Sequence, residues 1–360
     1  MTRAIGYAAQ DAETPLATFH FERRDLRSDD VAIDILYCGV CHSDLHQVRN
    51  DWNNTFYPCL PGHEIVGRVT AVGPEVTRFK VGEMAALGCM VDSCMKCEPC
   101  CAGQEQYCSH LPTMTYNSKD RQDGSLTFGG YSDHIVARDP FVLKLPEGLD
   151  PERAGPLLCA GITTWSPLRR WKIGPGSRVA VAGLGGLGHM GVKLAVGLGA
   201  DVTVVTTSPS KERDALALGA HRVLIAKDRT AMKQAARTFD MVLDTIPVAH
   251  DVQPYMHLLK VHGVHVIVGA IEPLPSVHSM LLVGWQRSLA GSMIGGIAET
   301  QELLDFCAAK NILPETETIA IQDINHAFER MERSDVKYRF VIDMASLKRE
   351  IAEGAGVRST

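Results

Sequence analysis

Four cysteines lie at the spacing of a metal site within one short stretch of the chain. They follow the pattern C-x2-C-x2-C-x7-C and are Cys94, Cys97, Cys100 and Cys108. Two residues between thiolates let both sulfur atoms face one tetrahedral centre, and four cysteines make a closed zinc site. The alternative is a set of buried free thiols. Four cysteines at this spacing favour a structural zinc, whose binding energy would order the loop.

A second set of candidate ligands is dispersed and consists of Cys41, His63 and Cys159. A lone cysteine or histidine is more often a core residue than a ligand. Taken together, however, two thiolates and one imidazole are typical of a catalytic zinc whose fourth position stays open. We expect Asp44 to accept the second ring N–H of His63 and thereby to fix its tautomer. We expect Glu64 to lie behind the metal as a mobile carboxylate.

A glycine-rich turn, Gly-Leu-Gly-Gly-Leu-Gly, occupies residues 183–188. In a dinucleotide site Gly183 would permit the tight turn, Gly185 would let a pyrophosphate approach the backbone, and Gly188 would allow close helix packing. The phosphates would bind at the helix N-terminus, where free N–H groups and the dipole favour anions. A tight turn alone is the alternative, but a predicted strand precedes this turn and a predicted helix follows it. The turn therefore indicates a dinucleotide site.

The end of the next predicted strand distinguishes the two nicotinamide cofactors. An NAD site carries Asp or Glu about 20 residues beyond the turn, but residues 205–211 read Val-Thr-Thr-Ser-Pro-Ser-Lys, and Asp201 begins the strand rather than ending it. A solvated lysine is the simpler explanation of Lys211, yet it does not explain the missing acid, so we predict NADP(H). We expect 2′-phosphate contacts at Thr206, Thr207, Ser208 and Lys211, and further cofactor contacts at Thr163, Leu184, Gly186, Leu187, Thr245, Gly269 and Ser292.

Two kinds of sequence pattern must position these groups. In the first 150 residues or so, alternating segments such as 30–37 and 65–72 predict an irregular, mostly antiparallel, barrel-like module. Between about 155 and 295, apolar runs alternate with helical patterns, which predicts βαβ units and a parallel sheet. The expected parallel strands are 178–182, 202–205, 223–225, 241–243 and 264–268, with a helix at 190–198.

The rest of the chain contains two predicted helices, 300–310 and 324–333, and a predicted strand, 338–342. The tail after Glu350 is rich in small residues, and we expect it to fray. We therefore expect three sections. These are a catalytic domain with the structural zinc loop at 1–154, an NADP-binding domain at 155–296, and a return to the catalytic domain at 297–360.

Length and charge restrict the class of protein. The chain has 360 residues, 45% of them hydrophobic, and a net charge of −6, which predicts two globular domains. Its basic residues are interspersed, and the cysteine loop carries Asp92, Glu98 and Glu105, so we expect no nucleic-acid partner and no zinc-ribbon binder. No run of about 18 apolar residues and no secretory signal is visible, so we expect a cytoplasmic protein without a membrane partner. In that compartment, eleven cysteines favour metal binding over disulfides.

The motifs together resemble those of the zinc-dependent medium-chain alcohol dehydrogenases. They are Gly-Val-Cys-His-Ser-Asp (39–44), Pro-Gly-His-Glu (61–64), the four-cysteine loop, the glycine turn and Tyr-Arg-Phe-Val-Ile-Asp (338–343), in this order over nearly the whole chain. Within that superfamily the chain is most similar to the cinnamyl alcohol dehydrogenase branch, which includes bacterial broad-range aldehyde reductases. The branch-like segments are Asn-Asp-Trp (50–52), Tyr-Pro (57–58), Gly-His-Met-Gly-Val-Lys (188–193) and Asp-Val-Lys-Tyr-Arg (335–339).

The resemblance implies an α/β fold, with a GroES-like, mostly-β catalytic domain and a Rossmann domain built on a doubly wound parallel sheet. It also implies two zinc ions per chain and an NADP(H)-dependent reaction between an aldehyde and a primary alcohol, which is aromatic, allylic or aliphatic. Cys41, His63 and Cys159 would bind the catalytic zinc, which polarises a carbonyl oxygen. Ser43 would donate the proton, and His46 would exchange it with solvent through the nicotinamide ribose.

Two other functions remain open at this point. The first is a 1,4-reductase of an unsaturated carbonyl or iminium on the same fold, although such members usually lose relay or zinc-ligand residues that this chain keeps. The second is a zinc- and nucleotide-binding module without catalysis, which would not need the dispersed ligands beside Ser43 and His46. We also expect a homodimer, because the apolar segment Met280–Val283 lies near the expected sheet edge, and a tetramer is not excluded.

Overall fold

The computed structural model describes residues 1–269 and 272–357, which form two compact units. Unit 1 consists of Met1–Cys159 together with the chain from Gly296 onward, and unit 2 consists of Ala160–Gly295. Cys159 is therefore the last residue of the first part of unit 1. It belongs to the same unit as Cys41 and His63.

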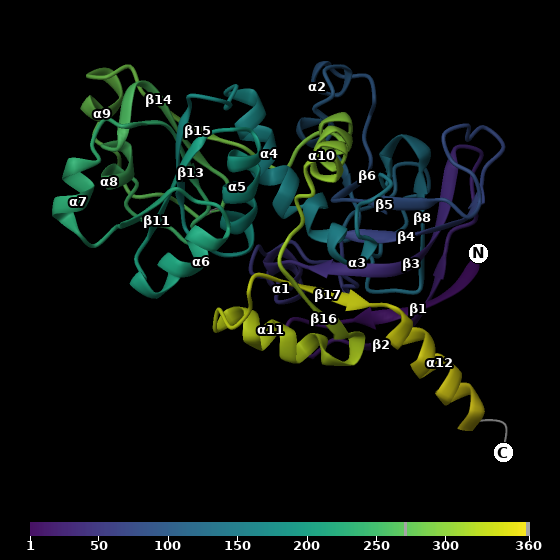
Figure 1. Cartoon of the computed structure of the whole chain (residues 1–360). Helices are drawn as coiled ribbons and strands as arrows, with labels where there is room; N and C mark the ends of the chain where they lie inside the picture. The colour runs from purple at the N-terminus through teal and green to yellow at the C-terminus, as the bar shows by residue number, and fades with distance from the viewer. Residues whose placement is uncertain (270–271, 358–360) are drawn as a thin grey trace. The chain divides into compact units, whose positions relative to one another are not determined.

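Unit 1 is built on a seven-stranded sheet with the order β16-β17-β3-β4-β5-β9, and β8 also pairs with β3 (Figure 1). All of its pairings are antiparallel except that of β16 with β17, which confirms the expected mostly antiparallel module. The strands are β3 (Asp30–Val40), β4 (Ile65–Val72), β5 (Met84–Leu87), β8 (His134–Arg138), β9 (Val142–Lys144), β16 (Thr316–Ala320) and β17 (Arg339–Asp343). Two small sheets accompany it: a hairpin of β1 (Thr2–Ala8) and β2 (Ala17–Arg23), and a two-stranded sheet of β6 (Met90–Asp92) and β7 (Thr113–Met114).

Short helical segments connect the strands of unit 1. Three longer helices lie in its second sequence segment, which begins at Gly296. The short segments are α1 (His42–Val48), α2 (Glu98–Cys101), η1 (Glu105–Tyr107), η2 (Asp139–Phe141), α3 (Pro151–Ala154), η3 (Gly155–Leu158) and η5 (Ile321–Asp323). The longer helices are α10 (Ile297–Lys310), α11 (Ile324–Glu332) and α12 (Ala345–Val357). The core beneath them contains fully buried side chains from β3, such as Ile33 and Ile35.

Unit 2 contains a parallel sheet of six strands in the order β12-β11-β10-β13-β14-β15 (Figure 1). The strands are β10 (Arg178–Ala182), β11 (Asp201–Thr206), β12 (Arg222–Ile225), β13 (Phe239–Asp244), β14 (Leu259–Ile267) and β15 (Ser288–Gly291). The strand order reverses between β10 and β13, and ligands of such sheets bind at this switch point, at the carboxyl ends of the strands. The expected doubly wound sheet is confirmed.

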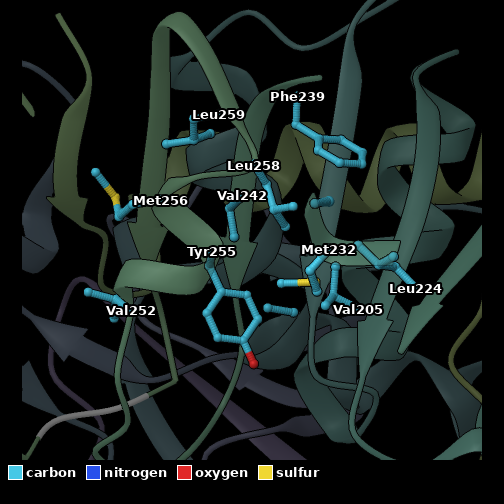
Figure 2. Close-up of a cluster of buried hydrophobic side chains, with 12 residues drawn as sticks. Val205, Leu224, Met232, Phe239, Val242, Val252, Tyr255, Met256, Leu258 and Leu259 are labelled. Atoms are coloured by element: carbon cyan, nitrogen blue, oxygen red, sulfur yellow. The ribbon is translucent and has the colours of Figure 1, made fainter. Parts of the chain in front are cut away.

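The helices of unit 2 are α4 (Ala160–Arg170), α5 (Gly186–Gly197), η4 (Pro209–Lys211), α6 (Glu212–Ala217), α7 (Arg229–Gln234), α8 (Gln253–Met256) and α9 (Met280–Val283). A buried cluster joins α7 and α8 to the sheet. Figure 2 shows Met232 from α7 and Tyr255 from α8 beside Val205 and Val242 of the strands. Close packing of this kind fixes the strands at whose carboxyl ends we expect the dinucleotide site.

Three helix boundaries differ clearly from the sequence-based expectation. The tail expected to fray after Glu350 is helical as far as Val357. Helix α10 begins at Ile297 rather than at residue 300, because the Glu105 carboxylate accepts the Ile297 N–H at 3.0 Å and caps the first turn. Helix α5 begins at Gly186, inside the glycine turn. Within the described residues, no helix combines the length and apolar character needed to cross a membrane.

Candidate active site

The dispersed candidate ligands meet in unit 1. One ligand atom each from Cys41, His63, Glu64 and Cys159 lies within 4.8 Å of the others, and all four residues are buried. Cys41 is the residue that caps α1 after β3, His63 and Glu64 directly precede β4, and Cys159 follows η3. The two sulfur atoms lie 3.9 Å apart. Two thiolates, an imidazole and a carboxylate are ligands that zinc accepts in tetrahedral geometry, so the donor set fits this metal.

Asp44 holds two of these ligands in place. Its carboxylate is completely buried and accepts the Cys41 N–H at 2.9 Å, the Gly62 N–H at 3.1 Å and the Nδ1 of His63 at 3.0 Å. The Tyr131 hydroxyl donates to it as well, at 3.2 Å. With Nδ1 facing Asp44, the Nε2 atom of His63 remains free for a metal.

Glu64 lies within the ligand cluster itself and contacts an arginine from the far end of the chain. Arg339, on β17, donates from Nη2 to Glu64 Oε1, and its Nη1 lies 3.9 Å from Cys41 Sγ. The other carboxylate oxygen, Oε2, is buried and has no hydrogen-bond partner among the described residues, which suits a cation as its partner. A Cβ atom at position 39 would overlap this oxygen, so Gly39 leaves the space that the carboxylate occupies.

The surroundings of Cys41 favour the metal-binding form of this one cysteine. The pKa of the Cys41 thiol lies well below its usual value, because Cys159 donates a hydrogen bond to it and the Arg339 guanidinium is close. Burial raises the pKa of Glu64 to about 7, although Arg339 opposes this shift. A thiolate is the form of cysteine that binds metals, so Cys41 is prepared for a metal ion.

The two candidate proton-transfer residues lie on α1. Ser43 is half-buried, with its Oγ 3.6 Å from Cys41 Sγ. His46 follows one turn later, its side chain is 41% exposed, and its Nδ1 lies 2.7 Å from Asp51 Oδ2. In the described part of the chain the two side chains share no hydrogen bond, so a proton path between them needs an intervening group.

The four-cysteine loop forms a second cluster, also in unit 1. The sulfur atoms of Cys94, Cys97, Cys100 and Cys108 all lie within 4.8 Å of one another. Backbone N–H groups of Cys100 and Ser109 lower the pKa of Cys97 to about 5, and Arg121 Nη2 lies 3.9 Å from Cys108 Sγ. Four converging thiols with nearby positive charge fit a tetrathiolate zinc site without an open position.

The glycine turn lies between β10 and α5 of unit 2. Gly183 has a φ of +91°, which side chains rarely adopt, and it makes the turn. A Cβ atom at Gly188 would lie 2.3 Å from the Gly183 carbonyl oxygen, so only glycine lets α5 pack this closely on the turn. Gly185 faces open space, is exposed and caps α5. The helix N-terminus is thus accessible to an anion, as a pyrophosphate requires.

The residues expected near a 2′-phosphate lie at the carboxyl end of β11. Thr206 ends the strand, and its Oγ1 accepts the Ser208 N–H at 3.2 Å. Thr207 is exposed. The Lys211 Nζ donates to the Leu184 carbonyl at 3.0 Å, so its ammonium group lies beside the glycine turn rather than in solvent. Asp201 begins β11, which leaves this strand end without an acid.

The other expected cofactor residues occupy several elements of unit 2. Gly186 and Leu187 open α5, and Leu184 is buried in the turn. The Thr245 hydroxyl donates to the Ala182 carbonyl at 2.8 Å, and a Cβ atom at Gly269 would lie 2.6 Å from the Thr245 carbonyl carbon. These residues therefore lie next to the turn. Two further ones stand on other elements: Thr163 is buried in α4, and Ser292 follows β15 and donates its N–H to Ile267 O at 3.2 Å.

Sequence reasoning missed three features of these sites. Arg339 stands 275 positions from Glu64, and Tyr131 stands 87 positions from Asp44, so no spacing connected them. The only available signal was a charged residue at the start of the apolar segment 339–342. A third feature, the contact of buried Asp244 with two histidines in unit 2, gave no signal either.

Comparison with protein families assigns both units. Residues 27–147 match the alcohol dehydrogenase GroES-like domain, and residues 186–309 match the zinc-binding dehydrogenase family. The first range contains both Cys41 and the four-cysteine loop, and the second begins within the glycine turn.

Proteins similar over almost their whole length support the same assignment. The chain is 50% identical to NADP-dependent alcohol dehydrogenase C 1 of Mycolicibacterium smegmatis, over 97% of this chain and 100% of that protein. It is 49% identical to the aldehyde reductase YahK of Escherichia coli, over 96% of this chain and 99% of that protein. Among solved structures, a cinnamyl alcohol dehydrogenase from Sorghum bicolor superposes with a TM-score of 0.92 at 42% identity, covering 96% of this chain and 98% of that one.

Thiol labelling distinguishes the clusters from ordinary cysteines. All eleven cysteines are free, and Cys101 is the exposed one; burial raises the pKa of Cys59 to about 12, which keeps that thiol unreactive. With zinc bound, iodoacetamide at neutral pH should label Cys101 first. After chelation of the metal, the half-buried Cys94 and Cys97 should react as well, at least about tenfold faster than before. Peptide mass spectrometry reads out both states, and labelling of Cys94 and Cys97 at the same rate with and without chelator would contradict the structural zinc.

Proposed function

The chain belongs to the zinc-dependent medium-chain alcohol dehydrogenases, in the cinnamyl alcohol dehydrogenase branch, and we propose that it serves as an NADPH-linked aldehyde reductase. It is an oxidoreductase with two cysteine-rich zinc sites. The observation that carries the proposal is the buried cluster of Cys41, His63, Glu64 and Cys159, with the Ser43 hydroxyl beside it. Two relatives named as an NADP-dependent alcohol dehydrogenase and as an aldehyde reductase support the direction and the cofactor.

The two zinc sites have different roles in this proposal. Cys94, Cys97, Cys100 and Cys108 would hold a structural zinc. Cys41, His63 and Cys159 would hold the catalytic one, with the Glu64 carboxylate beside it and the fourth position left for the substrate oxygen. When bound, the catalytic zinc supplies Lewis-acid polarisation of a carbonyl oxygen, and the reduced nicotinamide supplies a hydride. We propose aromatic, allylic or aliphatic aldehydes and the matching primary alcohols as substrates.

The residues around the cluster supply the proton and the electrostatic balance. Ser43 Oγ donates the proton that the reduced oxygen requires, and the part-exposed His46 returns a proton from solvent. Asp44 orients His63 through Nδ1, and Arg339 offsets the negative charge of the thiolates and of Glu64. A 1,4-reductase on the same fold is the second candidate, but the presence of both Ser43 and His46 favours carbonyl reduction.

Cofactor choice rests on the end of β11. Lys211 is held beside the glycine turn by the Leu184 carbonyl, and no acid stands at this strand end to bond a ribose 2′-hydroxyl. The 2′-phosphate of NADP(H) would replace that carbonyl as the partner of the ammonium group, with Thr206, Thr207 and Ser208 as hydroxyl donors. The glycine turn would receive the pyrophosphate at the N-terminus of α5.

Assembly and location complete the proposal. Strand β15 stands at the edge of the described six-stranded sheet, and the neighbouring Met280, Val283 and Met293 are exposed apolar side chains. We propose that two copies pair along this edge as a homodimer, because an unpaired strand edge flanked by apolar side chains is a template for association.

Eleven free thiols suit the reducing cytoplasm, which we propose as the compartment of this protein.

Activity and metal content test the proposed function together. Purified protein should contain two zinc ions per chain by mass spectrometry, and it should oxidise NADPH in the presence of cinnamaldehyde or benzaldehyde. Replacing the proton donor, Ser43→Ala, should lower kcat about 100-fold, since positioned proton donors contribute about 10²–10⁴-fold. Binding of NADPH should change less than about twofold, because Ser43 lies outside unit 2.

The controls for that experiment separate the competing functions. The Ser43→Ala protein must retain both zinc ions, so that slow turnover does not reflect metal loss. One zinc and no turnover with any aldehyde would support a binding module instead. Reduction of the C=C bond of cinnamaldehyde, with the carbonyl intact, would favour the 1,4-reductase. An unchanged rate for Ser43→Ala would remove this residue from the proton path.

Lys211→Ala tests the phosphate assignment. Loss of a charge-assisted contact should raise the KM for NADPH about tenfold and leave the KM for NADH almost unchanged. Steady-state kinetics with both cofactors measures the two constants. Lys227→Ala is the matched control, since Lys227 is an exposed lysine of the same unit, and it should affect neither. Equal effects of Lys211→Ala on the two cofactors would contradict the assignment.

Light scattering tests the dimer. The protein should elute with about twice its chain mass of 39.2 kDa. Val283, 77% exposed, lies on the proposed interface, so Val283→Glu should shift the population toward monomer. Leu216→Glu places the same charge at another exposed apolar side chain of unit 2 and should leave the dimer intact. A monomeric wild-type protein at micromolar concentration would refute the proposed interface.

A further inference from the structure

A buried carboxylate in unit 2 bridges two histidines at the carboxyl end of β13. Asp244 is the last residue of that strand and is completely buried. Its Oδ2 lies 2.9 Å from His250 Nε2 and 2.7 Å from His265 Nε2, and its Oδ1 accepts the Ile246 N–H at 3.1 Å. Because an ionised carboxylate only accepts hydrogen bonds, both rings donate to it from Nε2.

His250 joins this carboxylate to its own loop. Its second ring nitrogen, Nδ1, lies 2.9 Å from the Val248 carbonyl oxygen, which also only accepts. His250 therefore connects the buried Asp244 at the end of β13 to the backbone of its own loop at Val248. The edge of the Tyr255 ring closes the cluster, with ring centroids 5.6 Å from His250 and 6.3 Å from His265. Figure 2 shows Tyr255 among the apolar side chains of the same core.

The loop in question, residues 245–250, lies at the switch point of the sheet. It follows β13, the strand next to β10 and its glycine turn, and dinucleotides bind between these two strand ends. A Cβ atom at Gly183 would lie 2.9 Å from Thr245 Oγ1, and one at Gly269 would lie 2.7 Å from Ile246 O. The start of the loop is therefore wedged between the glycine turn and the chain after β14. The end of the loop is connected to β13 by the contact of His250 with Asp244.

A purely structural explanation accounts poorly for the cluster. The strand end adjoins an apolar core, where a hydrophobic side chain would pack without desolvating a charge. Buried ionic groups are often no more stabilising than such a replacement, but they can fix one conformation among several. The conformation fixed here is that of a loop which lines the dinucleotide site.

We propose that Asp244, His250 and His265 form a positioning site for the nicotinamide cofactor, which holds residues 245–250 against the glycine turn in the conformation that receives the dinucleotide. The inference rests on the proposed function, because it takes NADP(H) as the ligand. His250 is a positioning residue in this scheme. It acts through the loop backbone and not on the substrate.

The test compares three variants by NADPH fluorescence titration and by steady-state kinetics. His250→Ala removes the bond to Asp244 and should raise the Kd for NADPH about tenfold. At saturating NADPH, kcat and the KM for aldehyde should stay within about twofold of wild type. His250→Gln keeps an N–H donor within reach of Asp244 and should restore the Kd to within about threefold of wild type. His257→Ala, at an exposed histidine of the same unit, should change nothing.

Hydrogen exchange supplies a readout that does not depend on turnover. In His250→Ala without cofactor, the amides of residues 246 and 248–250 should exchange faster than in wild type, while those of β10 should not change. A His250→Ala protein that binds NADPH like wild type, or that loses kcat at an unchanged Kd, would overturn the positioning role. A wild-type protein that binds no NADPH would instead refute the proposed function, so the two failures are distinguishable.

Discussion

The buried Asp44 carboxylate is the interaction on which the zinc-binding half of the molecule depends. A buried charge without partners costs several kcal/mol, and this one is compensated by four donors from three separate segments. These are the backbone N–H groups of Cys41 and Gly62, the ring of His63 and the hydroxyl of Tyr131. Hydrogen bonds of the protein therefore determine where two metal ligands lie. The geometry of the open zinc site is prepared by the fold and does not have to be imposed by the ion.

The two units recognise their ligands by different physical means. In unit 1, side chains supply the ligand atoms, since thiols, an imidazole and a carboxylate converge on one point. In unit 2 the shape of the backbone matters more. Gly183, Gly188 and Gly269 stand where a Cβ atom would meet the main chain or a close neighbour. Substitution at a ligand of unit 1 removes a donor, whereas substitution at one of these glycines changes the shape of the turn. Lys211, whose ammonium group lies beside the turn, is the proposed exception in unit 2, because it would contribute a charge.

Local patterns predicted much of this arrangement, and contacts between distant positions were the part that they missed. The cysteine spacing between residues 94 and 108 and the strand–turn–helix order around residue 183 are short-range features, and the structure has both. Arg339 reaches Glu64 only because β17 pairs with β3, and no periodicity in the sequence specifies that pairing. Likewise, the sequence shows Asp244 only as the end of an apolar strand. Its contacts with two histidines, 6 and 21 positions away, appear only in the structure. The helical tail after Glu350 was missed because its composition of small residues suggested disorder, whereas Glu350 itself bonds Tyr7 and Thr18 of the first hairpin.

The division of unit 1 into two sequence segments has a consequence for the newly made chain. Strand β3 pairs with β17, which places Phe340 opposite Val40 and Val341 opposite Gly39. A ribosome finishes all of unit 2, which ends at Gly295, before it synthesises β17. Until then residues 37–40 of β3 lack this partner strand, and Glu64 lacks the guanidinium that balances it. Since domains fold as units during synthesis, we expect the nascent polypeptide to complete unit 2 first and to complete the surroundings of the catalytic metal site only near the end of translation.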